Sequence, residues 1–171
     1  MIKKEFLFCL LVLCSCGEET QPPKKPVQWN MEKSTEMNKE LAIEESINID
    51  LYFAQHEDWE VKQTGTGLRY VILKKTDGAI PKAGMDAKTQ YRISLLDGTE
   101  VYKTAADEVD VFRVDKSDME SGIHEGIKLM RVGEKAKLVF PSHLAHGLVG
   151  DLQKIPPLSP LVVDIELIGI E

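Results

Sequence analysis

The stretch DMESGIHEGIKLMRVGEKAKLVFPSHLAHG, residues 118–147, decides the fold, because its hydrophobic period changes from that of a helix to that of a strand. Its first part predicts a short helix with one apolar face, formed by Met119, Ile123, Ile127 and Met130. Gly122 and Gly126 on this helix permit a close approach to a sheet. Its second part, EKAKLVF at 134–140, predicts a strand.

Outward from this unit, apolar residues alternate with a period of two and predict four more strands. These are LRYVILKK (68–75), AKTQYRISLL (87–96), VDVFRV (109–114) and PLVVDIELIGI (160–170). Asp-Gly at 97–98 is a hairpin turn signal. The predicted fold class is α+β, an antiparallel five-stranded sheet wrapped on one short helix.

A second helix is predicted before the sheet. Residues 31–61 contain no Gly or Pro and favour an amphipathic helix over about 33–55. Its expected apolar positions are Met37, Leu41, Ile47, Leu51 and Tyr52. QTGTG at 63–67 ends this segment. The helix is a candidate contact for a homodimer, or an apolar groove for client polypeptides.

The N-terminus has the layout of an export signal. MIKKEFLFCLLVLCSCGEE (1–19) begins with lysines and continues with an apolar run, Phe6 to Leu13, that is too short to span a bilayer. LCSC resembles the lipobox of bacterial lipoproteins, which implies acylation of Cys16. The alternative is an ordinary secretory signal. A membrane-anchored lipoprotein is expected, periplasmic or on the cell surface, with the outer membrane as the favoured site.

These signals divide the chain into four parts. Residues 1–15 form the signal peptide, and 16–31 form the lipid anchor with a Pro-rich tether. Residues 32–63 form an N-terminal helical segment, and 64–171 form the main domain.

Composition excludes several function classes. The chain has 21 Lys and Arg against 28 Asp and Glu, a net charge of −7, which disfavours binding to nucleic acid or to anionic membrane surfaces. All three cysteines fall in the first sixteen residues, so no disulfide framework or thiol ligand set is expected in the domain. Phosphate-binding glycine motifs are absent from the sequence, and no cofactor is expected.

Two histidines three residues apart, in FPSHLAHG at 140–147, raise the question of a metal site or a triad. A zinc site needs three or four ligands and this motif supplies two, so no metal is expected. Ser142 beside His143, with Asp151 nearby, suggests a hydrolase only weakly, because neighbouring residues at a strand end point apart and no G-x-S-x-G elbow occurs.

Four acidic residues after the second predicted strand raise the question of a calcium site. They lack the central Gly and terminal Glu of a calcium loop, and a solvated edge is expected for Asp107, Asp110, Asp115 and Asp118.

Five segments in order carry a family resemblance. They are GLRYVILKK (67–75), YRISLLDGTEVYKT (91–104), GIHEGIKLMRVGE (122–134), GEKAKLVFPSHLAHG (133–147) and IPPLSPLVVDIELIGIE (155–171). Together they resemble an FKBP-type peptidyl-prolyl cis-trans isomerase domain over about residues 66–171. With the lipobox and the helix included, residues 111–147 are similar to the gliding-motility-associated isomerase lipoproteins of Bacteroidetes.

The resemblance implies a substrate bowl that works without metal or nucleophile. Its expected residues are Tyr91, Tyr102, Phe112, Met119, Glu120, Ile123, His146, Ile155 and Val163. Met119 and Glu120 open the helix and would supply the backbone N–H that meets the substrate carbonyl. His146 stands where the family usually places the flap tyrosine, so only this histidine is expected to face the bowl, with His143 near solvent.

Several expected bowl residues depart from the family. Tyr102 aligns with its usual pocket aspartate, and Ile123 and Val163 replace aromatic residues. The resemblance therefore implies a shallower bowl with fewer aromatic contacts. From the residues alone, Tyr91, Ile123 and Val163 fit a simple core role equally well.

The expected function is a membrane-anchored peptidyl-prolyl isomerase that assists the folding of exported proteins. Its partners would be proline-containing polypeptides, and the membrane through Cys16. The first alternative is a chaperone or binding module that keeps the fold without turnover, because Tyr102 and His146 depart from the family pattern. The second is a metal-binding lipoprotein, which rests on the histidines alone.

Overall fold

The computed structural model describes residues 30–171. The predicted signal peptide, the Pro-rich tether and the acylation site at Cys16 lie outside these residues. Within the described residues, no helix combines the length and the apolar character needed to cross a membrane.

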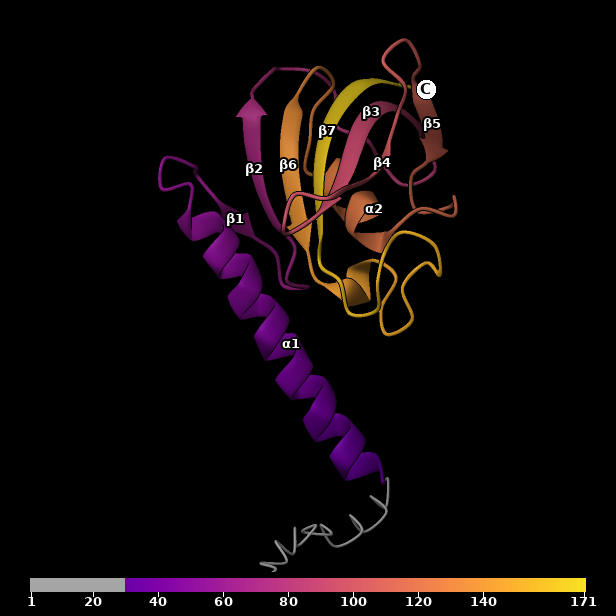
Figure 1. The fold of residues 1–171 in the computed structure, drawn as a ribbon. Coiled ribbons are helices and arrows are strands. Elements are labelled where there is room, and N and C mark those ends of the chain that lie inside the picture. Colours follow the sequence, from indigo (N-terminus) through magenta and orange to yellow (C-terminus); the bar gives the residue numbers. More distant parts are fainter. Residues whose placement is uncertain (1–29) are drawn as a thin grey trace, which may run out of the picture.

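The core of the molecule is an antiparallel sheet (Figure 1). Its strands are β1 Lys62–Gln63, β2 Arg69–Lys74, β3 Asp86–Leu95, β4 Glu100–Lys103, β5 Asp110–Arg113, β6 Lys135–Phe140 and β7 Leu161–Ile170. The order is β1-β2-β6-β7-β3-β4, and β5 also pairs with β3. The α+β prediction is confirmed, but the sheet has seven strands rather than five, because β1 and β4 join it.

The hairpin predicted at Asp-Gly 97–98 is confirmed and gives rise to β4. The N–H of Gly98 donates to the carbonyl of Leu95, and the Leu95 N–H donates to Thr99. The Gly98 φ of 87° is a left-handed conformation that glycine adopts without steric cost. This turn lets β4 fold back on the end of β3, which places the β4 side chains beside the candidate site.

Helix α2, Ser121–Ile127, packs against one face of the sheet. Its two glycines face β6, Gly122 toward the ring of Phe140 and Gly126 toward the side chain of Leu138. A Cβ at Gly126 would lie 2.3 Å from Leu138 Cδ1, so only glycine allows this close approach. The close approach predicted from these two glycines is confirmed.

Helix α1, Met31–Ala54, begins at Asn30, whose side chain accepts the Lys33 N–H at 2.8 Å. The predicted helix is confirmed, but its predicted buried face is wrong. The buried residues are Glu45, Ile49 and Phe53, at a spacing of four. Ile49 and Phe53 contact Val139 and Val162 on the face of the sheet opposite α2.

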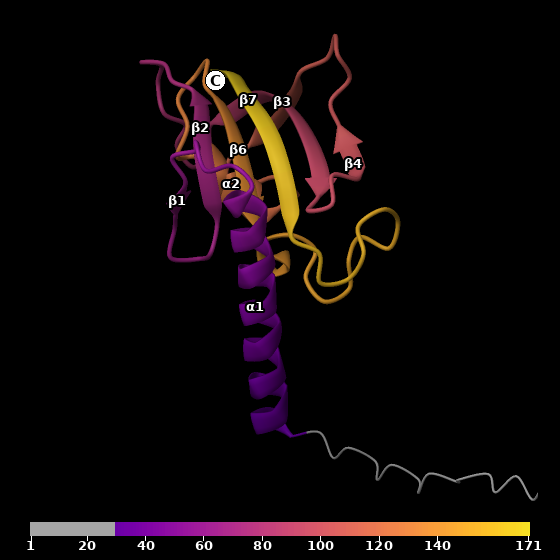
Figure 2. The same cartoon turned by 60° about the vertical axis from the view of Figure 1, so that its left-hand side comes forward.

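The N-terminal half of α1 extends past the sheet, as Figure 2 shows. Met37 is exposed on this half, and Ile47 and Leu51 of the predicted face are exposed because they lie on the side of the helix away from Ile49 and Phe53. Periodicity alone cannot distinguish a face that docks on the sheet from one that stays in solvent.

Polar contacts fix α1 on the domain. Glu45 accepts hydrogen bonds from the Ser142 N–H at 2.7 Å and from the Ser142 hydroxyl at 2.6 Å. Arg69 on β2 binds Asp50 at 2.8 Å and the Ser46 hydroxyl at 2.9 Å. Ser142 opens the 3-10 turn Ser142–Leu144 that leads away from β6. The helix thus anchors the start of the loop that closes the candidate site, and this use of Ser142 removes the weak hydrolase reading.

Candidate active site

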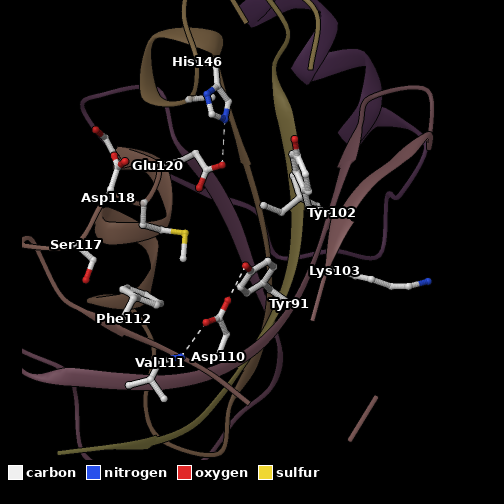
Figure 3. A pocket seen from close by; sticks show the side chains of 14 residues that line it. Tyr91, Tyr102, Lys103, Asp110, Val111, Phe112, Ser117, Asp118, Glu120 and His146 are labelled. Atoms are coloured by element: carbon white, nitrogen blue, oxygen red, sulfur yellow. Dashed lines mark hydrogen bonds and ion pairs between the residues drawn. The ribbon is translucent and has the colours of Figure 1, made fainter. Parts of the chain in front are cut away.

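A cavity of about 750 Å³ opens between the start of α2, the strands β3, β4 and β5, and the segment after the 3-10 turn (Figure 3). We call residues 145–160, which run from that turn to β7, the flap. The lining residues are Tyr91, Ile93, Tyr102, Lys103, Asp110, Val111, Phe112, Ser117, Asp118, Met119, Glu120, Ser121, Ala145 and His146.

The structure brings six of the nine predicted site residues to this cavity: Tyr91, Tyr102, Phe112, Met119, Glu120 and His146. The other three, Ile123, Ile155 and Val163, do not line it. They lie in the hydrophobic core between α2 and the sheet, each at most 3% exposed. Their role in binding stays a prediction, and in this structure they support the lining residues from behind.

Tyr91 on β3 is half-buried at one side of the cavity. Its hydroxyl donates a hydrogen bond of 2.7 Å to Asp110 on β5. Burial first, and then this carboxylate, raise the pKa of Tyr91 far above its usual value. The phenol therefore stays protonated at every physiological pH.

Asp110 was expected on a solvated edge with three other acidic residues, and for Asp110 this expectation is wrong. It lies two residues before the buried Phe112, so both side chains point to the same face of β5. That spacing is the sequence signal that could have revealed it. A carboxylate thus reaches the cavity from β5.

Tyr102 on β4 connects the cavity wall to the flap. Its hydroxyl donates to Asp151, and Lys154 donates to the carbonyl of Val101 at 2.9 Å. Lys154 also stands over the Tyr102 ring, 4.8 Å from its centre. The flap is therefore fastened to β4 at two neighbouring points.

Asp151 also organises the flap from within. Its Oδ1 accepts the backbone N–H groups of Gln153 and Lys154 at 2.9 Å and of Ile155 at 2.7 Å. Desolvation opposes its ionisation, but the hydrogen bond from Tyr102 and those from the backbone outweigh it, so the pKa of Asp151 lies well below its usual range. Sequence reasoning weighed Asp151 only as a weak triad member and missed this role.

The two histidines of FPSHLAHG have different surroundings, and only one of them lines the cavity. His146 lines the cavity, and its Nε2 donates to Glu120 at 3.2 Å. His143 is exposed, and its Nε2 donates to the carbonyl of Thr66 at 3.1 Å. Among residues 30–171, no group of three or more His, Cys, Asp or Glu side chains is placed to hold a metal ion.

A third histidine, His124, orders the loop that leads into α2. Its Nδ1 accepts the Asp115 N–H at 3.0 Å, so its Nε2 carries the proton and donates to the Ser117 carbonyl at 3.0 Å. The ring packs edge-on against Phe112, with centroids 5.5 Å apart. This neutral, buried imidazole fixes the approach to Met119 and Glu120.

The chemistry available in the cavity is binding and orientation rather than covalent attack. Its polar groups are phenols, an imidazole, carboxylates, the Lys103 amine and the hydroxyls of Ser117 and Ser121. The imidazole binds Glu120 rather than either serine, and the Ser142 hydroxyl is occupied by Glu45. Because α2 begins at Ser121, the N–H groups of Ser121 and Gly122 have no acceptor within the helix, whereas those of Ile123 and His124 donate to the Glu120 carbonyl. Such a site suits a substrate that changes shape without breaking a bond.

Comparison with known proteins agrees with this description. A family model described as FKBP-type peptidyl-prolyl cis-trans isomerase matches residues 78–168. FkpA of Aeromonas hydrophila is 37% identical over 131 residues, which are 76% of this chain and 48% of that protein. The chain spans about half the length of the curated relatives it matches.

Solved structures share the fold. The crystal structure of FkpA from Escherichia coli is similar with a TM-score of 0.67 and 32% identity, covering 81% of this chain and 64% of that one. A peptidyl-prolyl cis-trans isomerase from Pseudomonas syringae gives a TM-score of 0.63 at 26% identity, covering 85% of this chain and 98% of that one. The FKBP-like fold expected from the resemblance is thereby confirmed.

Proposed function

The chain belongs to the FKBP-type peptidyl-prolyl cis-trans isomerase family, and from this premise we propose that its cavity catalyses rotation about Xaa–Pro bonds in exported polypeptides. Uncatalysed rotation faces a barrier of about 18–20 kcal/mol and takes tens to hundreds of seconds. A tenfold acceleration requires about 1.4 kcal/mol of stabilisation of the twisted amide relative to the planar one.

The observation that carries this proposal is the grouping of donors around one cavity whose imidazole, His146, binds the Glu120 carboxylate and neither of the two lining serines. The planar amide is more charge-separated than the twisted one, so partial desolvation disfavours the planar form. The Glu120 N–H at the start of α2 would meet the carbonyl of the twisted amide, and Phe112 and Met119 provide apolar contact for the proline ring.

The second candidate function is a binding module without turnover. The acidic cavity favours it, since the carboxylates of Asp110 and Glu120 line the space that an apolar proline ring would occupy. A refolding assay separates the two functions, using a test protein whose slow phase is limited by one Xaa–Pro bond. Acceleration by amounts of the chain far below those of the test protein supports the enzyme. Retained client binding without any acceleration supports the binding module.

His146→Ala is expected to lower kcat/KM about threefold to tenfold, because the change removes a hydrogen-bond donor from the cavity wall and leaves Glu120 without its partner. His146→Tyr should keep or raise the activity, since a phenol also donates. His143→Ala is the matched control and should change little, because His143 is exposed outside the cavity. Equal losses in the two alanine variants would show that the histidines act as a pair.

We further propose attachment to a membrane through acylated Cys16, on the periplasmic or surface side. LCSC at 13–16 and the Pro-rich tether support it. Membrane fractionation of the wild-type chain and of Cys16→Ala tests the anchor, and equal release of both into the soluble fraction would contradict it.

The narrower resemblance of residues 111–147 supports a role in gliding motility. Normal surface spreading of a deletion strain would oppose that role.

We also propose that α1 contacts a second copy of the chain. On the side opposite its docked face, Ile43, Ile47 and Leu51 form an apolar stripe that is 60%, 53% and 59% exposed. Ile47→Glu is expected to shift a dimer to a monomer in sedimentation velocity experiments. Asn48→Glu is the matched control, because it adds the same charge to an exposed neighbour outside the stripe. Identical sedimentation of wild type and Ile47→Glu would rule out this contact.

A further inference from the structure

The charges that face the cavity are mainly negative. Asp110, Asp118 and Glu120 line it, and Lys103 is the one Lys or Arg in its lining. Figure 3 shows Asp110 and Glu120 approaching the cavity from different sides, while the Lys103 side chain extends away. Lys103 is paired with Glu100, outside the lining, at 2.7 Å. The positive charge of Lys103 is therefore paired with a carboxylate outside the cavity.

The two inward carboxylates are hydrogen-bonded to an imidazole and a phenol, and not to Lys or Arg. Glu120, whose side chain is only 11% exposed, binds the His146 imidazole. Asp110 accepts the Tyr91 hydroxyl and the Val111 N–H at 3.0 Å. Within residues 30–171, no Lys or Arg forms an ion pair with either carboxylate. Negative charge in a partly desolvated cavity is therefore left for a cationic ligand to balance.

The electrostatic influence of Glu120 extends across the cavity. The pKa of Tyr91 is raised by burial, then by Asp110, with a further contribution from Glu120. The pKa of Tyr102 is raised chiefly by the hydrogen bond to Asp151, again with a contribution from Glu120. The negative charge of Glu120 thus acts on two phenols from different strands, so it would also act on a charged ligand bound between them.

We propose that the cavity prefers Xaa–Pro bonds in which the residue before proline is Lys or Arg, and that Glu120 and Asp110 determine this specificity. The inference rests on the proposed function, in which the Glu120 N–H meets the Xaa carbonyl. The Xaa side chain branches from the Cα that is bonded to that carbonyl carbon, so a long cationic side chain reaches the Glu120 carboxylate. Its methylene stem would pack on Met119 and Phe112.

Peptides that differ only at Xaa test this preference, with Lys, norleucine or Glu before the proline. Norleucine keeps an unbranched apolar stem and removes the charge. NMR exchange spectroscopy with the full chain gives kcat/KM for each peptide, and chemical-shift titration gives Kd. We expect kcat/KM for Lys-Pro about tenfold above that for norleucine-Pro, and that for Glu-Pro about tenfold below it, with both ratios shrinking in 1 M salt.

Two single substitutions test whether a carboxylate of the cavity causes the preference. Glu120→Gln should reduce the Lys-to-norleucine ratio about threefold to fivefold, whatever happens to the absolute rates. Glu125→Gln is the matched control, since it removes the same charge from a nearby residue of α2 outside the cavity lining, and it should leave the ratio unchanged.

The readouts separate failure of this inference from failure of the proposed function. Equal kcat/KM and equal Kd for Lys-Pro and norleucine-Pro would overturn the preference even if both peptides are isomerised. A Lys-to-norleucine ratio unaffected by Glu120→Gln would overturn the assignment. If no peptide is isomerised, the enzyme proposal fails, and the Kd values still decide the preference: tighter binding of Lys-Pro supports it, and equal binding overturns it.

Discussion

Gly122→Ala is expected to lower the free energy of unfolding by about 2 kcal/mol, although alanine is the better helix former. An added Cβ would lie 2.4 to 2.6 Å from three atoms of the Phe140 ring. That ring is fully buried in the core, so relieving the overlap requires a shift of α2 or of β6. Overpacking of this kind costs up to about 3 kcal/mol, and the helix propensity of alanine returns about 1 kcal/mol.

Urea denaturation monitored by circular dichroism measures this loss. Gly65→Ala serves as the control, because a Cβ at Gly65 meets no atom within 4 Å, and little change is expected there. In a Phe140→Leu background, the cost of Gly122→Ala should shrink, since the smaller side chain leaves room for the Cβ. An unchanged denaturation midpoint in Gly122→Ala would mean that α2 does not pack on β6 as described.

Asp151→Ala is expected to reduce kcat/KM at least tenfold with little loss of global stability. The change leaves three backbone N–H groups of the flap and the Tyr102 hydroxyl without their acceptor. The flap carries His146 into the cavity, so its loosening disperses one wall of the site. Activity and the hydrogen exchange of flap amides, measured on the same sample, should change together.

Asp151→Asn is the matched variant, because it keeps an oxygen acceptor while removing the charge, and an intermediate loss is expected. The pH dependence has a definite sign. The pKa of Asp151 is lower in the folded chain than in the unfolded one. Its contribution to the free energy of unfolding is therefore fully present above the unfolded pKa of about 4, and it is lost as the pH falls through the folded pKa. Flap amides as protected in Asp151→Ala as in the wild type would refute the anchoring role.

The sequence predicted elements whose signals are local. The helix with Gly122 and Gly126 and the Asp-Gly hairpin were found because spacing and turn chemistry are properties of a few neighbouring residues. The docked face of α1 was missed because Ile49 and Phe53 are buried by strands some ninety residues or more along the chain. A pattern within the helix cannot show which face a distant strand will cover.

The sequence predicted most of the residues on the cavity wall, but not the carboxylates that bind its two tyrosines. Resemblance located Tyr91, Tyr102 and His146, which the structure places on the cavity wall. The carboxylate partners came from elsewhere, Asp110 from β5 and Asp151 from the flap. Acidic residues on a sequence are most often solvated. The two-residue spacing from Phe112 is a local signal for Asp110, but only its position in space reveals that Asp151 binds a phenol.

The central claim is that this cavity speeds rotation about an Xaa–Pro bond, and cis–trans exchange of one short Leu-Pro peptide tests it most directly. With the chain at a hundredth of the peptide concentration or less, NMR exchange spectroscopy should show an exchange rate that rises in proportion to the chain added. An exchange rate that stays at the uncatalysed value at every chain concentration would contradict the claim.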